Sequence, residues 1–128
     1  MKIAIDTNIL VRLTVLDDRF QLKKVFQIME TYGHKEIFIA YGVLIETYFV
    51  LRKFYGRTEK EILSFFQDIL QVDQFAFEQE TALRLAVSKF QNGFDFKDAL
   101  IGEIGGTKNL RTLTFDKDLK NNSNFTVL

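Results

Sequence analysis

The sequence of 128 residues contains no cysteine, no proline and no tryptophan. Without cysteine the chain has neither disulfides nor thiolate metal ligands, so a secreted scaffold held together by disulfides is excluded. Without proline, its turns depend on Gly, Asn and Asp. No run approaches the roughly 18 uninterrupted apolar residues of a membrane span, and no basic leader with an apolar core opens the chain. These absences predict a soluble protein of the cytoplasm.

The chain also lacks an excess of charge of either sign, with 17 Lys and Arg against 17 Asp and Glu. Many nucleic-acid-binding proteins carry a strong basic excess, so a function of that kind has to be argued here from a local site. Hydrophobic residues make up 47% of the sequence, and fourteen residues are Phe. This composition and length predict a single domain with one core over residues 1–128.

Strand-like and helix-like segments alternate along the chain. Strands are predicted at residues 2–5, 36–40, 75–77 and 110–114, whereas residues 125–128 are too few to decide on a fifth strand. Helices are predicted at residues 8–13, 18–32, 43–55, 58–70, 80–90 and 96–105, and Thr58 with Glu61 forms a capping-box pattern. Because parallel strands need crossover connections, this order predicts an α/β fold with a mostly parallel sheet of four to five strands.

Two acids follow predicted strands, Asp6 after the first and Asp116 after the fourth. In parallel sheets ligands bind outside the carboxyl ends of the strands, so both acids are candidates for one site. Asp6 is followed by Thr7 and Asn8, which adds a hydroxyl and an amide, and such a group could hold a divalent cation. The ordinary alternatives are that Asp6 caps the next helix and that Asp116 belongs to a turn.

Glu46 lies in a helix whose apolar residues cover nearly all of its surface, so we expect this helix to be largely buried. A buried carboxylate is normally paired, hydrogen-bonded or bound to a metal. No basic residue precedes Arg52 in this segment to pair with it along the helix. The alternatives are an exposed Glu46 at a helix end or a partner distant in the sequence.

Asp95 and Asp98 share one side of a predicted first helical turn, where they could bind a metal or water together. Their ordinary alternative is a role in starting the helix. Acids at two strand ends and near two helix starts can converge on one pocket at the carboxyl edge of the sheet. Oxygen ligands without cysteine favour Mg²⁺ or Mn²⁺ over Zn²⁺. His34, next to Gly33 in a turn, is expected to be exposed to solvent and not a ligand.

Four segments resemble the PIN domain family in their order and spacing, and the resemblance covers essentially the whole chain. They are MKIAIDTNILV, VLIETYFVLRKFYG, DFKDALIGEIG and TLTFDKDL. The resemblance implies a three-layer α/β/α sandwich. It implies that the active-site acids are Asp6, Glu46, Asp98 and Asp116, with Asp95 as a neighbour that contributes to metal binding, and that Thr7, Asn8 and Thr114 support them by hydrogen bonding.

Within that family, single-domain chains of this length resemble VapC-type toxins, which are metal-dependent ribonucleases silenced by a cognate antitoxin. The resemblance implies an endoribonuclease that hydrolyses RNA to 5′-phosphate and 3′-hydroxyl ends with one or two Mg²⁺ or Mn²⁺ ions. The basic residues that could hold the RNA backbone are Arg52, Lys53, Arg57, Lys97, Lys117 and Lys120.

The apolar residues of segments 8–13, 18–32 and 43–55 exceed what one small core needs, which predicts exposed patches and a homodimer. Two alternative functions stay open. One is a catalytically silent interaction module with the PIN fold. The other is a Mg²⁺-dependent phosphatase of the haloacid-dehalogenase type, which also carries an Asp after its first strand. Such phosphatases usually have a second Asp two residues later, where this chain has Asn8.

Overall fold

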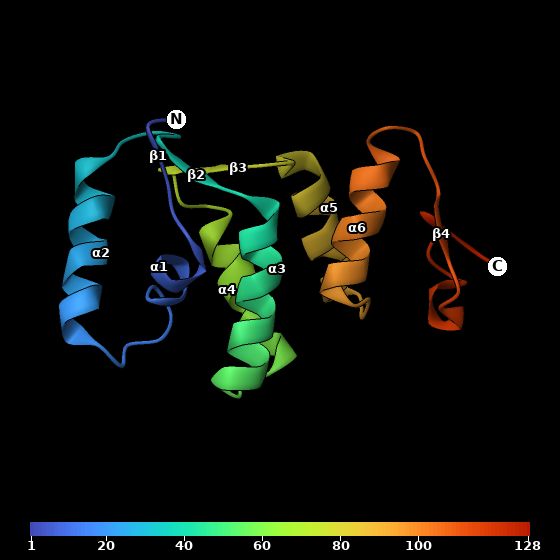
Figure 1. The fold of residues 1–128 in the computed structure, drawn as a ribbon, viewed down its shortest axis with the longest axis horizontal. Helices are drawn as coiled ribbons and strands as arrows, with labels where there is room; N and C mark the ends of the chain where they lie inside the picture. The colour runs from blue at the N-terminus through green and yellow to red at the C-terminus, as the bar shows by residue number, and fades with distance from the viewer. The chain divides into compact units, whose positions relative to one another are not determined.

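A computed structural model describes the whole chain, from Met1 to Leu128 (Figure 1). The strands are β1 (Ile3–Ala4), β2 (Ile37–Ile39), β3 (Phe75–Phe77), β4 (Thr112–Thr114) and β5 (Phe125–Val127). The α-helices are α1 (Thr7–Val11), α2 (Arg19–Thr31), α3 (Tyr41–Phe49), α4 (Glu59–Ile69), α5 (Glu80–Gln91) and α6 (Phe96–Gly106). A π-helix, η1 (Val50–Phe54), follows α3, and a 3-10 helix, η2 (Lys117–Leu119), follows β4.

All strand pairings are parallel. β2 lies between β1 and β3, with Ile37 opposite both Ile3 and Phe75, and β4 pairs with β5 through Thr112 and Phe125. The predicted α/β class and parallel strands are therefore confirmed, and the undecided residues near the C-terminus form β5. The five strands form two hydrogen-bonded sheets, one of three strands and one of two.

The contacts of the chain divide it into two compact units, an N-terminal unit (Met1–Glu78) and a C-terminal unit (Gln79–Leu128). Each sheet belongs to one unit. A single domain over residues 1–128 stays a prediction. None of the helices combines the length and the apolar character that crossing a membrane requires.

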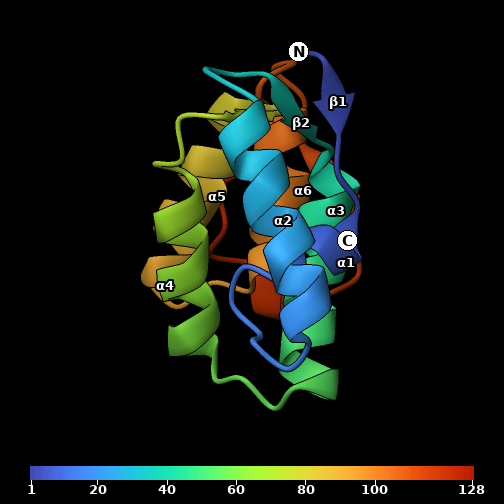
Figure 2. The ribbon, with the colours of Figure 1, turned by 90° about the vertical axis from the view of Figure 1, so that its left-hand side faces the viewer.

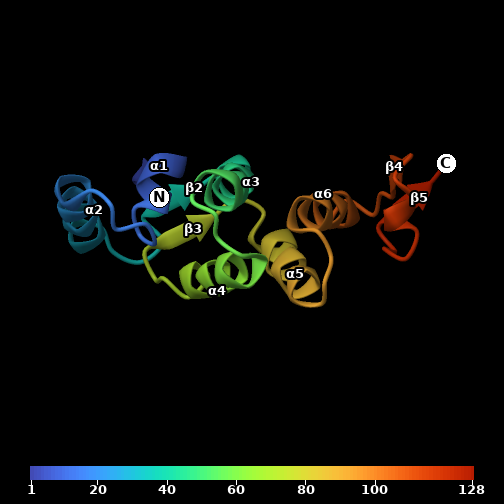
Figure 3. The same ribbon diagram turned by 90° about the horizontal axis from the view of Figure 1, so that it is seen from below.

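The core of the N-terminal unit is built on its sheet, where Ile37, Ile39 and Phe75 are completely buried. α1 lies beside α3 (Figure 3), whereas α2 lies on the outside of the unit (Figure 2) and buries only Val25. The predicted capping box opens α4. The Thr58 amide donates to Glu61 Oε1 at 3.0 Å, and the Glu61 amide donates to Thr58 Oγ1 at 3.1 Å.

The segment predicted as one largely buried helix over residues 43–55 differs from that expectation. It is an α-helix followed by a π-helix, and its buried side chains, Leu44, Thr47, Tyr48 and Leu51, follow a single face. Phe54 is 84% exposed, and Glu46 is exposed as well. Apolar residues occur all around this helix, but only one face has neighbouring elements that cover it.

In the C-terminal unit α5 and α6 pack side by side (Figure 1), and the rings of Phe90 and Phe96 lie 5.7 Å apart. α6 also approaches β5 closely. A Cβ atom added to Gly102 would lie 2.7 Å from Phe125 Cε2, a distance that real Cβ atoms do not adopt. The absence of a side chain at Gly102 therefore allows β5 to pack against α6.

We predict that Gly102→Ala destabilises the protein by about 1–3 kcal/mol, because Phe125 is buried and has little room to move. Gly42→Ala in α3 is the matched control, since its added Cβ meets no atom within 4 Å. It should stabilise the protein by about 0.5–1 kcal/mol through higher helix propensity. Urea unfolding of both variants measures the two changes, and equal effects of the two substitutions would contradict the close packing at Gly102.

Candidate functional site

Asp6 follows β1 and caps α1. Its Oδ1 accepts a hydrogen bond from the Ile9 amide at 3.1 Å, which satisfies one of the free N–H groups of the first helical turn. The ordinary interpretation of this residue is therefore correct. The capping bond uses one carboxylate oxygen and leaves the exposed carboxyl with a second oxygen for a ligand.

Glu46 is exposed, so the expectation that it is a buried acid in need of a partner was wrong. It nevertheless borders a cavity of about 160 Å³ together with residues of α1. The lining residues are Thr7, Asn8, Val11, Arg12, Glu46, Val50 and Tyr55. Glu46 of α3 thus shares a cavity with Thr7 and Asn8, the two residues that follow Asp6.

Asp95 and Asp98 form the start of α6. Asp95 is the N-cap, and its Oδ1 accepts a hydrogen bond from the Asp98 amide at 2.9 Å. Burial raises the pKa of the Asp98 carboxyl, and the negative charges of Asp95 and Asp116 raise it further, while Lys97 acts against them. These three acids of the C-terminal unit are therefore close enough to repel one another.

Thr114 and Asp116 fix the turn that leaves β4. The Asp116 amide donates to Thr114 Oγ1 at 3.0 Å, and Asp116 Oδ1 accepts from the Asp118 amide at 2.9 Å. Asp116 is thus the N-cap of η2. The first of these hydrogen bonds involves the backbone amide of Asp116, and the support of its carboxylate by Thr114 stays a prediction.

The acids fall into two groups, one in each unit, which we name the N-terminal and the C-terminal half-site of the metal site predicted from the sequence. Asp6 and Glu46 belong to the N-terminal unit, and Asp95, Asp98 and Asp116 belong to the C-terminal unit. No group of three or more His, Asp or Glu residues is placed so that it could hold a metal ion. The donors of each half are oxygen atoms, which suit Mg²⁺ or Mn²⁺. The assignment of these residues as metal ligands stays a prediction.

His34 is exposed, as predicted. Its Nδ1 lies 2.6 Å from Asp73 Oδ1, and both side chains are about 70% exposed, at 70% and 69%. This pair lies in the turns before β2 and β3 and contributes to neither half-site.

Arg12, which belongs to none of the predicted motifs, is the only buried charged residue of the N-terminal unit. Its guanidinium forms an ion pair with Asp17 and donates to the Tyr55 hydroxyl at 2.8 Å. The detectable sign in the sequence is one cation inside the otherwise apolar run from Ile9 to Leu13.

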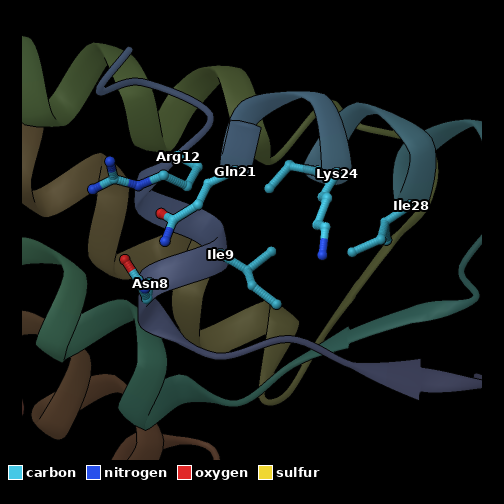
Figure 4. A pocket seen from close by; sticks show the side chains of 7 residues that line it. Asn8, Ile9, Arg12, Gln21, Lys24 and Ile28 are labelled. Atoms are coloured by element: carbon cyan, nitrogen blue, oxygen red, sulfur yellow. The ribbon is translucent and has the colours of Figure 1, made fainter. Parts of the chain in front are cut away.

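A second cavity of about 230 Å³ lies between α1 and α2 (Figure 4). It is lined by Asn8, Ile9, Arg12, Gln21, Lys24, Val25 and Ile28. No acid borders it, so it does not extend either half-site.

Parallel strands followed by acids that cap the next helix define an α/β protein with candidate cation-binding positions. The sequence matches the family model of the PIN domain over residues 3–124, and the chain belongs to the PIN domain family. Members of this family are generally nucleases that use divalent metals. Among solved structures, the chain is similar to a toxin-antitoxin complex from Klebsiella pneumoniae, with 18% identity and a TM-score of 0.36 over 99% of this chain and 97% of that one. No curated protein matches it.

We predict that Asp98→Asn raises the melting temperature of the metal-free protein, because it removes a charge that burial and two neighbouring acids disfavour. Asp68→Asn, at an exposed position of α4, is the control and should change the melting temperature little. Calorimetry in the presence of a chelator measures both. A lower melting temperature for Asp98→Asn would contradict the mutual repulsion.

The pH dependence follows from the same raised pKa. In the folded protein Asp98 keeps its proton to a higher pH than in the unfolded chain, so the wild type loses stability as the pH rises from the ordinary value of 3.8 through the folded pKa. The Asp98→Asn variant has an uncharged amide at this position and therefore has no such loss. The gain in melting temperature should be larger at pH 7 than at pH 4.

Proposed function

We propose that the protein is a metal-dependent endoribonuclease that hydrolyses phosphodiester bonds in RNA. Membership of the PIN family supports this proposal. The observation in the structure that carries it is the gathering of Asp95, Asp98 and Asp116 at the starts of α6 and η2, where burial and the charges of Asp95 and Asp116 raise the pKa of Asp98. The ligands in this proposal are Asp6, Glu46, Asp98 and Asp116, with Asp95 contributing.

A divalent cation, when bound, supplies positive charge at the scissile phosphate and lowers the pKa of a bound water. The residues of the chain hold the proposed ligands in place. The capping bonds to the Ile9 and Asp98 amides hold Asp6 and Asp95 in fixed orientations at the starts of their helices. Thr7 and Asn8 offer a hydroxyl and an amide beside Glu46.

Cations near the C-terminal half-site would hold the RNA backbone. Lys97 adjoins Asp98 and lowers its pKa, and Lys117 and Lys120 are exposed in and after η2. In the N-terminal unit Arg57 donates to the Thr14 carbonyl at 3.0 Å, so its guanidinium is partly committed to the fold. Arg52 and Lys53 are exposed.

In the cell we propose that this ribonuclease is the toxin of a VapBC-type toxin-antitoxin pair and acts in the cytoplasm. The partner is a cognate antitoxin protein. A basic side chain of the antitoxin would reach the acids and displace the metal by charge, while the rest of its tail covers apolar surface.

We predict that Asp6→Asn and Asp98→Asn each abolish cleavage of a structured RNA in the presence of Mn²⁺. Each change removes a ligand charge with little change of volume, and Asn can still cap α1 at position 6. Asp73→Asn is the control, because this exposed acid pairs with His34 outside both half-sites. It should retain wild-type activity.

Circular dichroism establishes that the variants are folded. A folded Asp6→Asn variant with full activity would refute the assignment of the site. Wild-type protein that binds a partner yet cleaves no RNA with Mn²⁺ would favour the catalytically silent module.

We further propose a homodimer that uses the outer face of α2, where Phe20 is 68% exposed and Phe26 is 52% exposed. The excess of apolar residues expected in segment 8–13 is not found at the surface, because Leu10 and Val11 of α1 are buried. α2 presents two exposed aromatic rings that a second copy would cover, and Phe54 of segment 43–55 is a further exposed ring.

We predict that light scattering at high micromolar concentration gives twice the chain mass of 15.0 kDa. Phe26→Ser should lower this mass toward that of a monomer. Leu85→Ser, at a residue of α5 that is 48% exposed, should leave the dimer intact. A monomeric wild type at this concentration would refute the proposal.

A further inference from the structure

Arg12 lies at the end of α1 with its side chain only 6% exposed. Besides the ion pair with Asp17 and the hydrogen bond to Tyr55, its guanidinium carbon lies 5.9 Å from the centre of the Tyr55 ring. One buried side chain therefore joins three segments, namely α1, the loop that follows it and the residue that ends η1.

The same side chain connects the two parts of the N-terminal half-site. Asn8 lies one helical turn before Arg12 on the same side of α1. Glu46 lies in α3, which continues directly into η1 and Tyr55. The hydrogen bond between Arg12 and Tyr55 thus links the segment that carries Glu46 to the helix that starts after Asp6.

The cavity beside Glu46 shows this arrangement directly, because Arg12 and Tyr55 line it together with Thr7 and Asn8. In Figure 4 the Arg12 guanidinium points away from Lys24 and Ile28, although Arg12 also lines the cavity between α1 and α2. Arg12 Nε is buried without a hydrogen-bond partner.

A buried charge is a costly way to stabilise a fold, and well-packed apolar residues often do so at lower cost. The guanidinium group of arginine is planar, and its N–H groups can donate to two partners in fixed directions. We propose that Arg12 and Tyr55 are positioning residues for the metal site, which set the placement of Glu46 relative to Asp6, Thr7 and Asn8. This inference rests on the proposed metal-dependent function.

The test measures the dissociation constant of Mn²⁺ for the full chain without RNA, by electron paramagnetic resonance of free Mn²⁺. Tyr55→Phe keeps the ring and removes the hydroxyl. Arg12→Lys keeps the charge and removes the planar guanidinium group. Each should weaken Mn²⁺ binding about tenfold, as loss of a group that orients metal ligands does.

Tyr48→Phe is the matched control. Tyr48 lies in α3, the helix that carries Glu46, and its hydroxyl donates to Glu59 Oε1 at 2.8 Å, outside the lining of the cavity. Each Tyr→Phe change removes one hydrogen bond between a tyrosine hydroxyl and a charged side chain, so both should lower the melting temperature. Only Tyr55→Phe should weaken Mn²⁺ binding.

The outcomes separate the positioning role from the metal site itself. Wild-type Mn²⁺ affinity in folded Tyr55→Phe and Arg12→Lys proteins would overturn the positioning role and leave the metal site in place. If Tyr48→Phe and Tyr55→Phe weaken Mn²⁺ binding equally, Arg12 and Tyr55 only stabilise the fold, and the positioning role is overturned as well. A wild type that binds no Mn²⁺ would overturn the proposed function, and the positioning role with it. If Arg12→Lys does not fold, Tyr55→Phe decides the question alone.

Discussion

Helix capping by carboxylates is the interaction on which both half-sites depend. Asp6, Asp95 and Asp116 each accept a hydrogen bond from an amide in the helical turn that follows. This bond holds the carboxylate at the positive end of the helix and limits its rotation. Because the cap uses one oxygen, the same residue can start a helix and offer its other oxygen to a cation. The structural and the proposed functional roles of these acids are therefore compatible.

Each unit also contains one buried charged residue that holds its elements together. In the N-terminal unit Arg12 joins α1 to Asp17 and Tyr55. In the C-terminal unit Glu103 of α6 accepts from Lys89 Nζ and from Asn124 Nδ2, both at 2.8 Å. Leaving either charge without its partners would be strongly unfavourable in a buried environment. These networks therefore specify where the neighbouring loops lie.

The network around Glu103 bears on Asp116. Asn124 directly precedes β5, which pairs with β4 and contacts η2. The close packing of Phe125 on Gly102 fixes the same strand against α6. Asp116 begins η2, so its position relative to the start of α6 is set by packing within the C-terminal unit. Burial and Asp95 raise the pKa of Asp98, and the charge of Asp116 in this arrangement raises it further.

The sequence by itself determined the features that depend on neighbours a few residues away. The order of strands and helices, the capping box of Thr58 and Glu61, and the N-cap at Asp95 all follow from local patterns, and the structure contains each of them. The short pairing at β5 was undecided because its partner β4 comes from a separate segment.

Tertiary structure alone decided which side chains are buried. The apolar pattern around Glu46 predicted burial, yet only the face with Leu44 and Leu51 is covered, and Glu46 is exposed. Arg12 shows the opposite case. Arginine side chains are usually exposed, but Arg12 is buried because its interaction partners hold it inside the unit. Local sequence specifies the helix, whereas burial depends on contacts with residues far along the chain, such as that between Arg12 and Tyr55.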